Sequence, residues 1–179
     1  KILVPLDGSP LAEQVLPYVR LVAKALKAKV ELLQVLGPVA PDLVDPAHGR
    51  YLDEILAGMR GQAGAYLDKV GASLRKAGLS VSTDVHEGNP AEYIISGAAT
   101  EKDTLIAMTT HGRSGIARWV LGSVTEKVLN AASNPLLVVR ARKKPIPSNQ
   151  VRLDVTILPL DGSMLAEQAI PHVAALATA

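Results

Sequence analysis

Short apolar runs alternate along the chain with longer stretches in which apolar residues recur every three or four positions. The short runs are typical of buried strands, and the periodic stretches are typical of helices that pack one face against a sheet. Their alternation predicts an α/β fold, an open parallel five-stranded sheet with helices on both faces. The predicted strands are residues 2–6, 30–36, 79–86, 104–109 and 136–140.

Polarity within each predicted strand indicates its place in the sheet. Residues 104–109 are almost wholly apolar, as expected of a central strand that is covered on both faces. Residues 80–86 alternate between polar and apolar side chains, which favours an edge strand. An order that fits these patterns is 3-2-1-4-5, which is Rossmann-like. In that order Leu136–Val139 lies at the other edge, where an apolar strand should pair with another chain or another domain.

Four helices should connect the strands, and capping residues mark where three of them begin. Ser9 and Asn89 have side chains that cap helix N-termini, and each is followed by proline, which suits the first helical position. Ser123 precedes Glu126 by three residues, the spacing of a capping box. The longest helix should cover residues 51–77. We expect its core-facing side chains to be Leu52, Ile55, Leu56, Met59, Tyr66, Val70 and Leu74.

A segment near the start of the chain recurs near its end, at an offset of 154 residues. Residues 5–17 read PLDGSPLAEQVLP and residues 159–171 read PLDGSMLAEQAIP, so ten of thirteen positions are identical. The stretch between the copies includes a run rich in basic residues and proline, the composition of a linker. We therefore predict a complete unit over residues 1–141, a linker over 142–154, and the first strand and helix of a second, incomplete unit over 155–179.

Composition excludes several classes of protein. Apolar residues make up 48% of the chain and charged residues 20%, which is ordinary for a globular domain. The absence of cysteine rules out disulfides and thiolate metal sites, and it fits a reducing, cytoplasmic setting. No apolar run is long enough to span a membrane. A net charge of +2 and 3% aromatic residues provide neither the basic surface nor the stacking side chains expected of a nucleic-acid-binding protein.

The segment MTTHGRSGIARWVLGSVT, residues 108–125, contains two glycines that suit a phosphate site. Gly112 lets the backbone turn and a ligand approach closely, while Gly122 and Ser123 place free N–H groups at a helix N-terminus, where the helix dipole favours an anion. An ordinary glycine-containing loop is the alternative interpretation. The position of the segment, at the carboxyl end of a central strand, favours a binding site.

Asp7 directly follows the first strand, in a turn formed by Asp7, Gly8 and Ser9. Such a turn is also common as a simple helix cap. If the strand order is 3-2-1-4-5, the first and fourth strands flank a topological switch point, and Asp7 lies opposite the glycine-containing segment. A carboxylate in that place could hold a ribose hydroxyl or a metal ion.

With these motifs in place, the chain resembles the universal stress protein family in its tandem-domain form. The ATP-binding branch of that family has the pattern G-x-x-G, nine residues, then G-[ST]. Gly112, Gly122 and Ser123 match the second glycine, the third glycine and the hydroxyl residue, and Thr109 stands at the first glycine position. The resemblance implies the fold of the adenine nucleotide alpha hydrolase-like proteins.

The resemblance also implies a site for ATP, with Mg²⁺ as its companion ion. Asp7 would face the ribose or the metal, and Val35 and Met108 would face the adenine. Pro5 and His111 would line the pocket, and the chain neighbours Leu6 and Thr109 complete it. The residues implied to hold the phosphates are Gly112, Gly122, Ser123, Val124 and Thr125.

A nucleotide-sensing stress-response module that acts through dimer or domain assembly is the function that the resemblance implies. Its partners would be an adenine nucleotide and a second copy or domain paired through Leu136–Val139, with no nucleic acid and no membrane. One alternative is a slow ATP-hydrolysing or adenylylating enzyme of the same α/β class, although only Asp7 and His111 could serve as a general base. The other is a structural dimerisation module without nucleotide. No catalytic residue is assigned.

Overall fold

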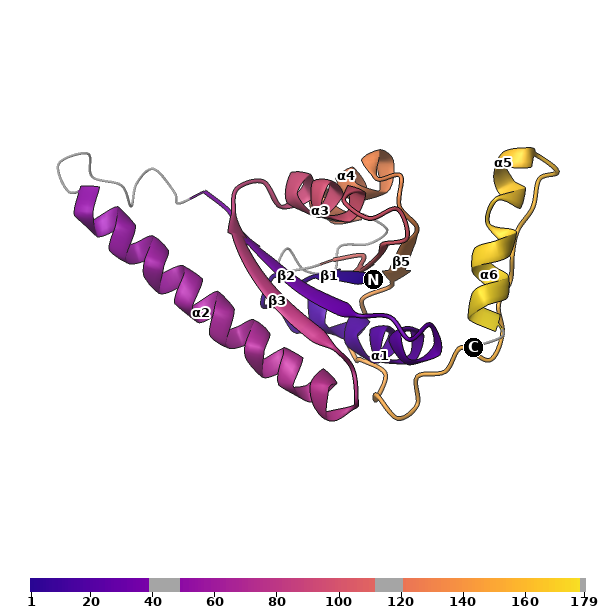
Figure 1. Cartoon of the computed structure of the whole chain (residues 1–179), viewed down its shortest axis with the longest axis horizontal. Helices are drawn as coiled ribbons and strands as arrows, with labels where there is room; N and C mark the ends of the chain where they lie inside the picture. Colours follow the sequence, from indigo (N-terminus) through magenta and orange to yellow (C-terminus); the bar gives the residue numbers. More distant parts are fainter. Residues whose placement is uncertain (39–48, 112–120, 178–179) are drawn as a thin grey trace.

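The computed structural model describes residues 1–38, 49–111 and 121–177, and its centre is a parallel sheet of five strands (Figure 1). The order β3-β2-β1-β4-β5 confirms the predicted α/β fold and strand order. It also makes β4 a central strand and places β3 and β5 at the edges, as the polarity patterns predicted. The strands are β1 (Ile2–Pro5), β2 (Val30–Leu36), β3 (Val81–Glu87), β4 (Leu105–Thr109) and β5 (Leu136–Val139).

Helices cover both faces of the sheet (Figure 1). The elements on one face are η1 (Ala12–Val15), α1 (Leu16–Ala25) and α2 (Gly49–Lys76). The elements on the other face are α3 (Pro90–Ala99) and α4 (Ser123–Ala131). Side chains alternate along each strand, so β1 directs Val4 toward the first layer and Leu3 toward the second, and both are fully buried. The core therefore consists of two apolar layers with the sheet between them.

The first helix begins later than predicted. The Ser9 hydroxyl accepts a hydrogen bond from the Ala12 N–H at 3.1 Å, as a capping residue should. The chain after Pro10 nevertheless forms the 3-10 helix η1, and regular α-helix starts at Leu16. Pro17 then lies in the first turn of α1, where its missing N–H costs no hydrogen bond.

The helix caps on the other face were predicted with mixed success. The Asn89 side chain accepts a hydrogen bond from the Ala91 N–H, which confirms Asn89 as the N-cap of α3. Ser123 was predicted to cap α4, but the cap is Gly122, and Ser123 is the first helical residue. The reason is that Gly122 has an extended backbone and its carbonyl already accepts from the Glu126 N–H at 2.9 Å.

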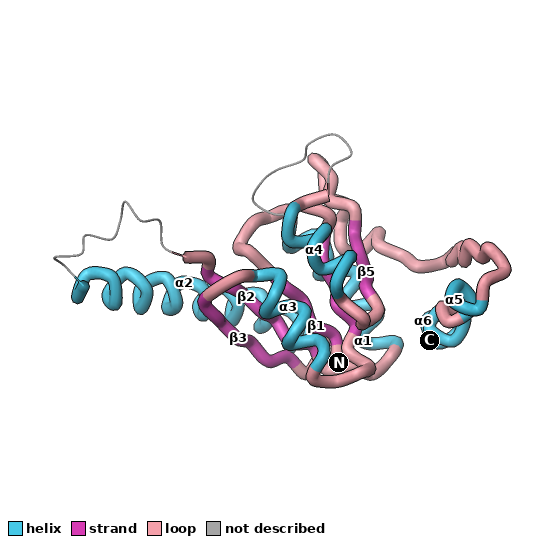
Figure 2. The backbone as a smooth tube through the Cα atoms, turned by 90° about the horizontal axis from the view of Figure 1, so that it is seen from above, coloured by secondary structure: helices cyan, strands magenta, loops and turns pink. Residues whose placement is uncertain are grey.

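α2 packs against the sheet mainly through its second half, where Ala63, Leu67, Val70 and Leu74 are buried. The first half extends past the strands in both views (Figures 1 and 2). Ile55, predicted to face the core, is instead 37% exposed. The cause is the length of α2. With its 28 residues α2 is longer than the 7-residue strand β2, so its first half extends beyond the sheet and has no strand to pack against. Among the described residues, no helix is long and apolar enough to span a membrane.

The two edges of the sheet differ in how their backbone groups are covered. On β3, the Arg75 guanidinium donates to the Val81 carbonyl at 3.3 Å, and the Asp84 carboxylate accepts from the Val85 N–H at 2.9 Å. Within the described parts of the chain, no side chain forms a hydrogen bond of this kind with the backbone of β5. Side chains therefore cover part of the β3 edge, whereas the β5 edge is open.

Residues 140–152, here called the connector, leave β5 and run back along η1 and α1. The Gln14 side chain pairs with the Arg142 backbone in both directions, donating to its carbonyl at 2.8 Å and accepting from its N–H at 2.9 Å. Ala141 and Val151 are buried. Although most connector side chains are exposed, its backbone is thus fixed to the first unit at several points.

Beyond the connector the chain lies apart from the sheet in both views (Figures 1 and 2). Two short helices form, α5 (Met164–Glu167) and α6 (Ile170–Ala177). The strand predicted at residues 155–160 does not form, because no strand lies beside it to accept its hydrogen bonds. Its apolar side chains remain in water, with Val155 81% and Ile157 86% exposed.

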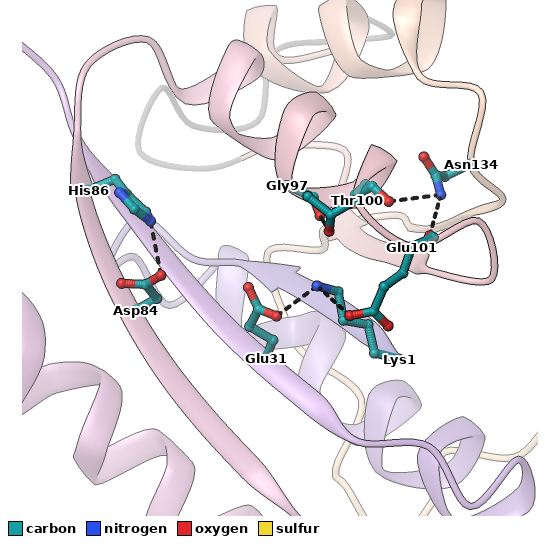
Figure 3. Close-up of polar contacts among 9 residues, drawn as sticks. Lys1, Glu31, Asp84, His86, Gly97, Thr100, Glu101 and Asn134 are labelled. Carbon is teal, nitrogen blue, oxygen red and sulfur yellow. Dashed lines mark hydrogen bonds and ion pairs between the residues drawn. The ribbon is translucent and has the colours of Figure 1, made fainter.

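Polar contacts close the end of the sheet where β1 starts (Figure 3). The Lys1 ammonium lies 3.0 Å from the Glu31 carboxylate and 3.4 Å from that of Glu101. Burial alone would lower the pKa of Lys1, but the hydrogen bonds and charges of the two carboxylates outweigh it and raise that pKa above its usual value. The Asn134 amide donates to the Ala98 and Glu101 carbonyls nearby. Structural contacts therefore occupy this end of the sheet.

Candidate functional site

A pocket of about 260 Å³ opens at the carboxyl ends of β1, β2 and β4. This is the position at which open α/β sheets bind ligands, because the chain leaves β1 and β4 toward opposite faces and a crevice remains between them. Fifteen residues line it. They are Pro5, Leu6, Asp7, Ala12, Leu33, Val35, Pro90, Ile94, Met108, Thr109, His111, Gly122, Ser123, Val124 and Thr125.

One side of the pocket is apolar. Val35 lies on β2 and Met108 on β4, on either side of β1, and Ile94 reaches the pocket from α3. All three belong to or pack against the core layer between the sheet and the helices α3 and α4. Such a surface suits a flat, weakly polar group that gains by leaving water, such as a nucleobase.

The other side of the pocket is the N-terminus of α4. Gly122 packs so closely on the end of β4 that a Cβ added there would lie 3.2 Å from the Thr110 carbonyl oxygen. The Gly122 N–H donates to that oxygen at 2.8 Å, and the Thr125 hydroxyl donates to the Thr109 carbonyl at 3.0 Å. These contacts hold the first turn of α4 against the strand. The N–H groups of Ser123 and Val124, at the start of the helix, lack intrahelical partners and favour an anion.

Asp7 enters the pocket from the turn after β1. Gly8 has a φ of +81°, which L side chains rarely adopt, and this allows the Asp7 carboxylate to accept from the Ser9 N–H at 2.9 Å. The turn thus fixes the carboxylate beside the pocket. Among the described residues, no group of three or more histidine, aspartate or glutamate side chains could hold a metal ion. A cation here would need oxygen ligands from a bound molecule as well as from Asp7.

Thr109 and His111 complete the wall between the two sides. The Thr109 side chain is buried, and its hydroxyl donates to the His111 carbonyl at 2.7 Å, which tightens the turn that follows β4. The His111 Nδ1 atom lies 3.0 Å from the Thr110 hydroxyl. Its Nε2 atom is buried, and no hydrogen-bond partner for it lies among the described residues.

The structure brings together every predicted site residue that it describes: all eleven line this one pocket. Gly112, the remaining predicted residue, lies outside the described residues. Sequence reasoning missed four lining residues. They are Ala12, Leu33, Pro90 and Ile94. Leu33 lies on a predicted strand and the other three lie at or near predicted helices, but no local pattern signals that a residue of these elements faces a cavity.

Comparison with known proteins identifies clear relatives. The family model described as the universal stress protein family matches residues 1–140. Universal stress protein MJ0531 of Methanocaldococcus jannaschii is 34% identical over 145 residues, which cover 80% of this chain and 84% of that protein. The solved structure of the hypothetical protein MJ0577, from the same organism, has a TM-score of 0.69 and 30% identity, and the match covers 80% of this chain and 96% of that one.

A longer relative also matches the part of the chain beyond residue 140. The crystal structure of a universal stress protein from Archaeoglobus fulgidus has a TM-score of 0.75 and 25% identity. The match covers 98% of this chain but 61% of that one. That protein therefore contains a counterpart of nearly the whole chain and continues well past it.

Two further solved structures are complexes with nucleotides. One is a universal stress protein in complex with cAMP, with 22% identity and a TM-score of 0.57 over 79% of this chain and 96% of that one. The other is the universal stress protein from Archaeoglobus fulgidus in complex with dAMP, with 20% identity and a TM-score of 0.52 over 77% of this chain and 95% of that one. At these identities the likeness shows a shared fold.

Proposed function

The chain belongs to the universal stress protein family, and on that premise we propose that its pocket binds ATP and that the protein acts as a nucleotide-sensing module in a stress response. One observation carries the proposal. A single pocket joins an apolar wall, formed by Val35, Ile94 and Met108, to the unpaired N–H groups at the start of α4. An adenine nucleotide has the matching parts, a flat base at one end and phosphates at the other.

The nucleotide complexes of two proteins with this fold support the choice of ligand class. One of them is in complex with cAMP and the other with dAMP, both of which are adenine nucleotides. Asp7 lies at the edge of the pocket, where its carboxylate could accept from a ribose hydroxyl or supply one oxygen to Mg²⁺. When bound, Mg²⁺ would neutralise phosphate charge, and the phosphates would add oxygen ligands to the one that Asp7 could supply, since the described residues form no metal-binding group of their own.

Calorimetric titration with ATP, with and without Mg²⁺, tests the proposal. We expect saturable binding of one ATP to each chain, tighter than binding of a pyrimidine nucleotide, because the apolar wall should prefer the larger purine base. Absence of binding would contradict the proposal and favour a structural dimerisation module instead. An assay for ADP or for an adenylylated product, run on the same samples, would identify slow turnover.

We also propose how the module assembles. The open β5 edge would pair with a second copy or domain, and residues 155–177 would begin a second unit of the same fold. The match of the longer Archaeoglobus fulgidus protein to 98% of this chain supports the second part. A nucleotide bound at the first unit could then alter how two units meet.

A further inference from the structure

Thr110 lies just outside the pocket and forms hydrogen bonds with several separate parts of the fold. Its N–H donates to the Val139 carbonyl of β5 at 2.9 Å, and its carbonyl accepts from the Gly122 N–H at the start of α4. Its hydroxyl oxygen accepts from the Ala141 N–H at 3.2 Å and lies 3.0 Å from His111 Nδ1. A single side chain therefore contacts both a pocket residue and the connector.

These contacts leave the Thr110 hydroxyl able to donate a hydrogen bond to His111. The Thr110 oxygen uses a lone pair to accept from Ala141, which leaves its own proton free to be donated. We infer that this proton goes to His111 Nδ1, so that Nδ1 is the acceptor and the ring carries its proton on Nε2. Nε2 is the buried atom for which the described residues provide no partner. An unpaired buried N–H is costly, and an oxygen of a bound ligand would satisfy it.

The same contacts continue into the connector. Ala141 is buried, and the next residue, Arg142, is held by the Gln14 side chain through two backbone hydrogen bonds. Gln14 lies in η1, a few residues after the Asp7 turn that borders the pocket. The first two residues after Arg140 are thus fixed from both sides, by Thr110 and by Gln14.

We propose that His111, Thr110 and Ala141 form a hydrogen-bond relay that carries occupancy of the pocket to the connector, with Thr110 as the positioning residue. This rests on the proposed function, because the relay needs a ligand that accepts from His111 Nε2. Donation from Nε2 makes Nδ1 a better acceptor, which strengthens the bond from the Thr110 hydroxyl and in turn its hold on the Ala141 N–H. Ligand binding then tightens the segment that leads to residues 153–177.

NMR on the full chain tests the relay without any variant. At pH 8 the ¹⁵N shifts of His111 should show a proton on Nε2 and an unprotonated Nδ1. Addition of ATP should move the His111 signals and slow exchange of the Ala141 amide by about twofold or more. A proton on Nδ1 in the free protein would overturn the relay as described.

Three variants separate the relay from general tightening on binding. Thr110→Val keeps the shape but removes the hydroxyl, so Ala141 exchange should become about tenfold faster and no longer respond to ATP. Thr110→Ser should restore both properties. Gln14→Ala releases Arg142 without touching Thr110, so it should expose the Arg142 amide and leave the response of Ala141 to ATP intact.

The outcomes distinguish the relay from the function on which it rests. If calorimetry detects no ATP binding to the unmodified protein, the proposed function fails and the relay loses its input. If ATP binds but Ala141 exchange and the His111 shifts are unchanged, the relay is wrong and the proposed function stands. A response of Ala141 that persists in Thr110→Val would also overturn the relay.

Discussion

At the scale of single residues, Gly122 shows why a glycine can be needed for space rather than for backbone freedom. Its φ of −62° is accessible to any residue, so nothing in the backbone demands glycine. What a side chain would disturb is the contact with Thr110, whose oxygen lies 3.2 Å from the position of an added Cβ. The absence of a side chain also leaves the first amides of α4 open to the pocket.

We therefore expect Gly122→Val to weaken ATP binding by at least about tenfold, because a valine side chain would occupy the space beside the first-turn amides. Gly58→Val is the matched control, since an added Cβ at Gly58 in α2 meets no atom within 4 Å. Calorimetry measures the affinity, and circular dichroism checks that both variants remain folded. Unchanged affinity in Gly122→Val would remove the α4 N-terminus from the phosphate site.

Residues next to strand ends were the predictable part of the site. Asp7 and Met108 follow or end apolar runs that any reading of the sequence places on strands, so their meeting at one sheet end follows from strand order. Pro90 and Ile94 reach the pocket from α3, and their contribution depends on how far that helix lies over the sheet. That distance is set by packing between α3 and α4, which no local pattern encodes.

At the scale of elements, the internal repeat shows which structure forms from neighbouring residues alone and which needs distant parts of the chain. Gly8 and Gly162 share a φ of +81°, and the aspartate one residue before each accepts from the serine one residue after it at 2.9 Å in both copies. Hydrogen bonds from Ser163 hold the pKa of Asp161 below its usual value. The turn thus forms from its own residues, with or without a sheet. The strand before the second turn does not form, because a strand needs neighbours that lie elsewhere in the chain.

The contrast between the two sheet edges leads to a prediction about assembly. Thr110 N–H bonds the Val139 carbonyl and Ile106 N–H bonds the Pro135 carbonyl, so alternate residues face β4 and the Val138 backbone faces outward. If β5 pairs with a second copy, Val138→Pro should break the assembly by removing an outward N–H, while β4–β5 pairing survives. Light scattering of the wild type, Val138→Pro and the control Val138→Ile measures this. A monomeric wild type would contradict intermolecular pairing.

At the scale of the whole molecule, the two ends of the sheet differ in what they contain. Ion pairs and amide contacts of Lys1 and Asn134 occupy one end, and the pocket occupies the other. The connector begins at the pocket end, since Ala141 binds the residue that precedes His111. The segment that leaves the first unit therefore lies beside the pocket, as the proposed relay requires.

The exposed apolar side chains beyond the connector lead to the last prediction. Val155, Ile157 and Met164 are each more than four-fifths exposed. Neighbouring apolar side chains with this exposure are typical of a surface that packs against another protein surface. No described pocket residue lies beyond Thr125, so a chain truncated after Arg152 should still bind one ATP, with affinity within about twofold of the full chain. It should also be more soluble, because the exposed apolar segment is gone. Calorimetry and light scattering on both chains measure these properties. Two ATP molecules bound to the full chain, or equal solubility of the two chains, would contradict the interpretation of residues 155–177 as the start of a second unit.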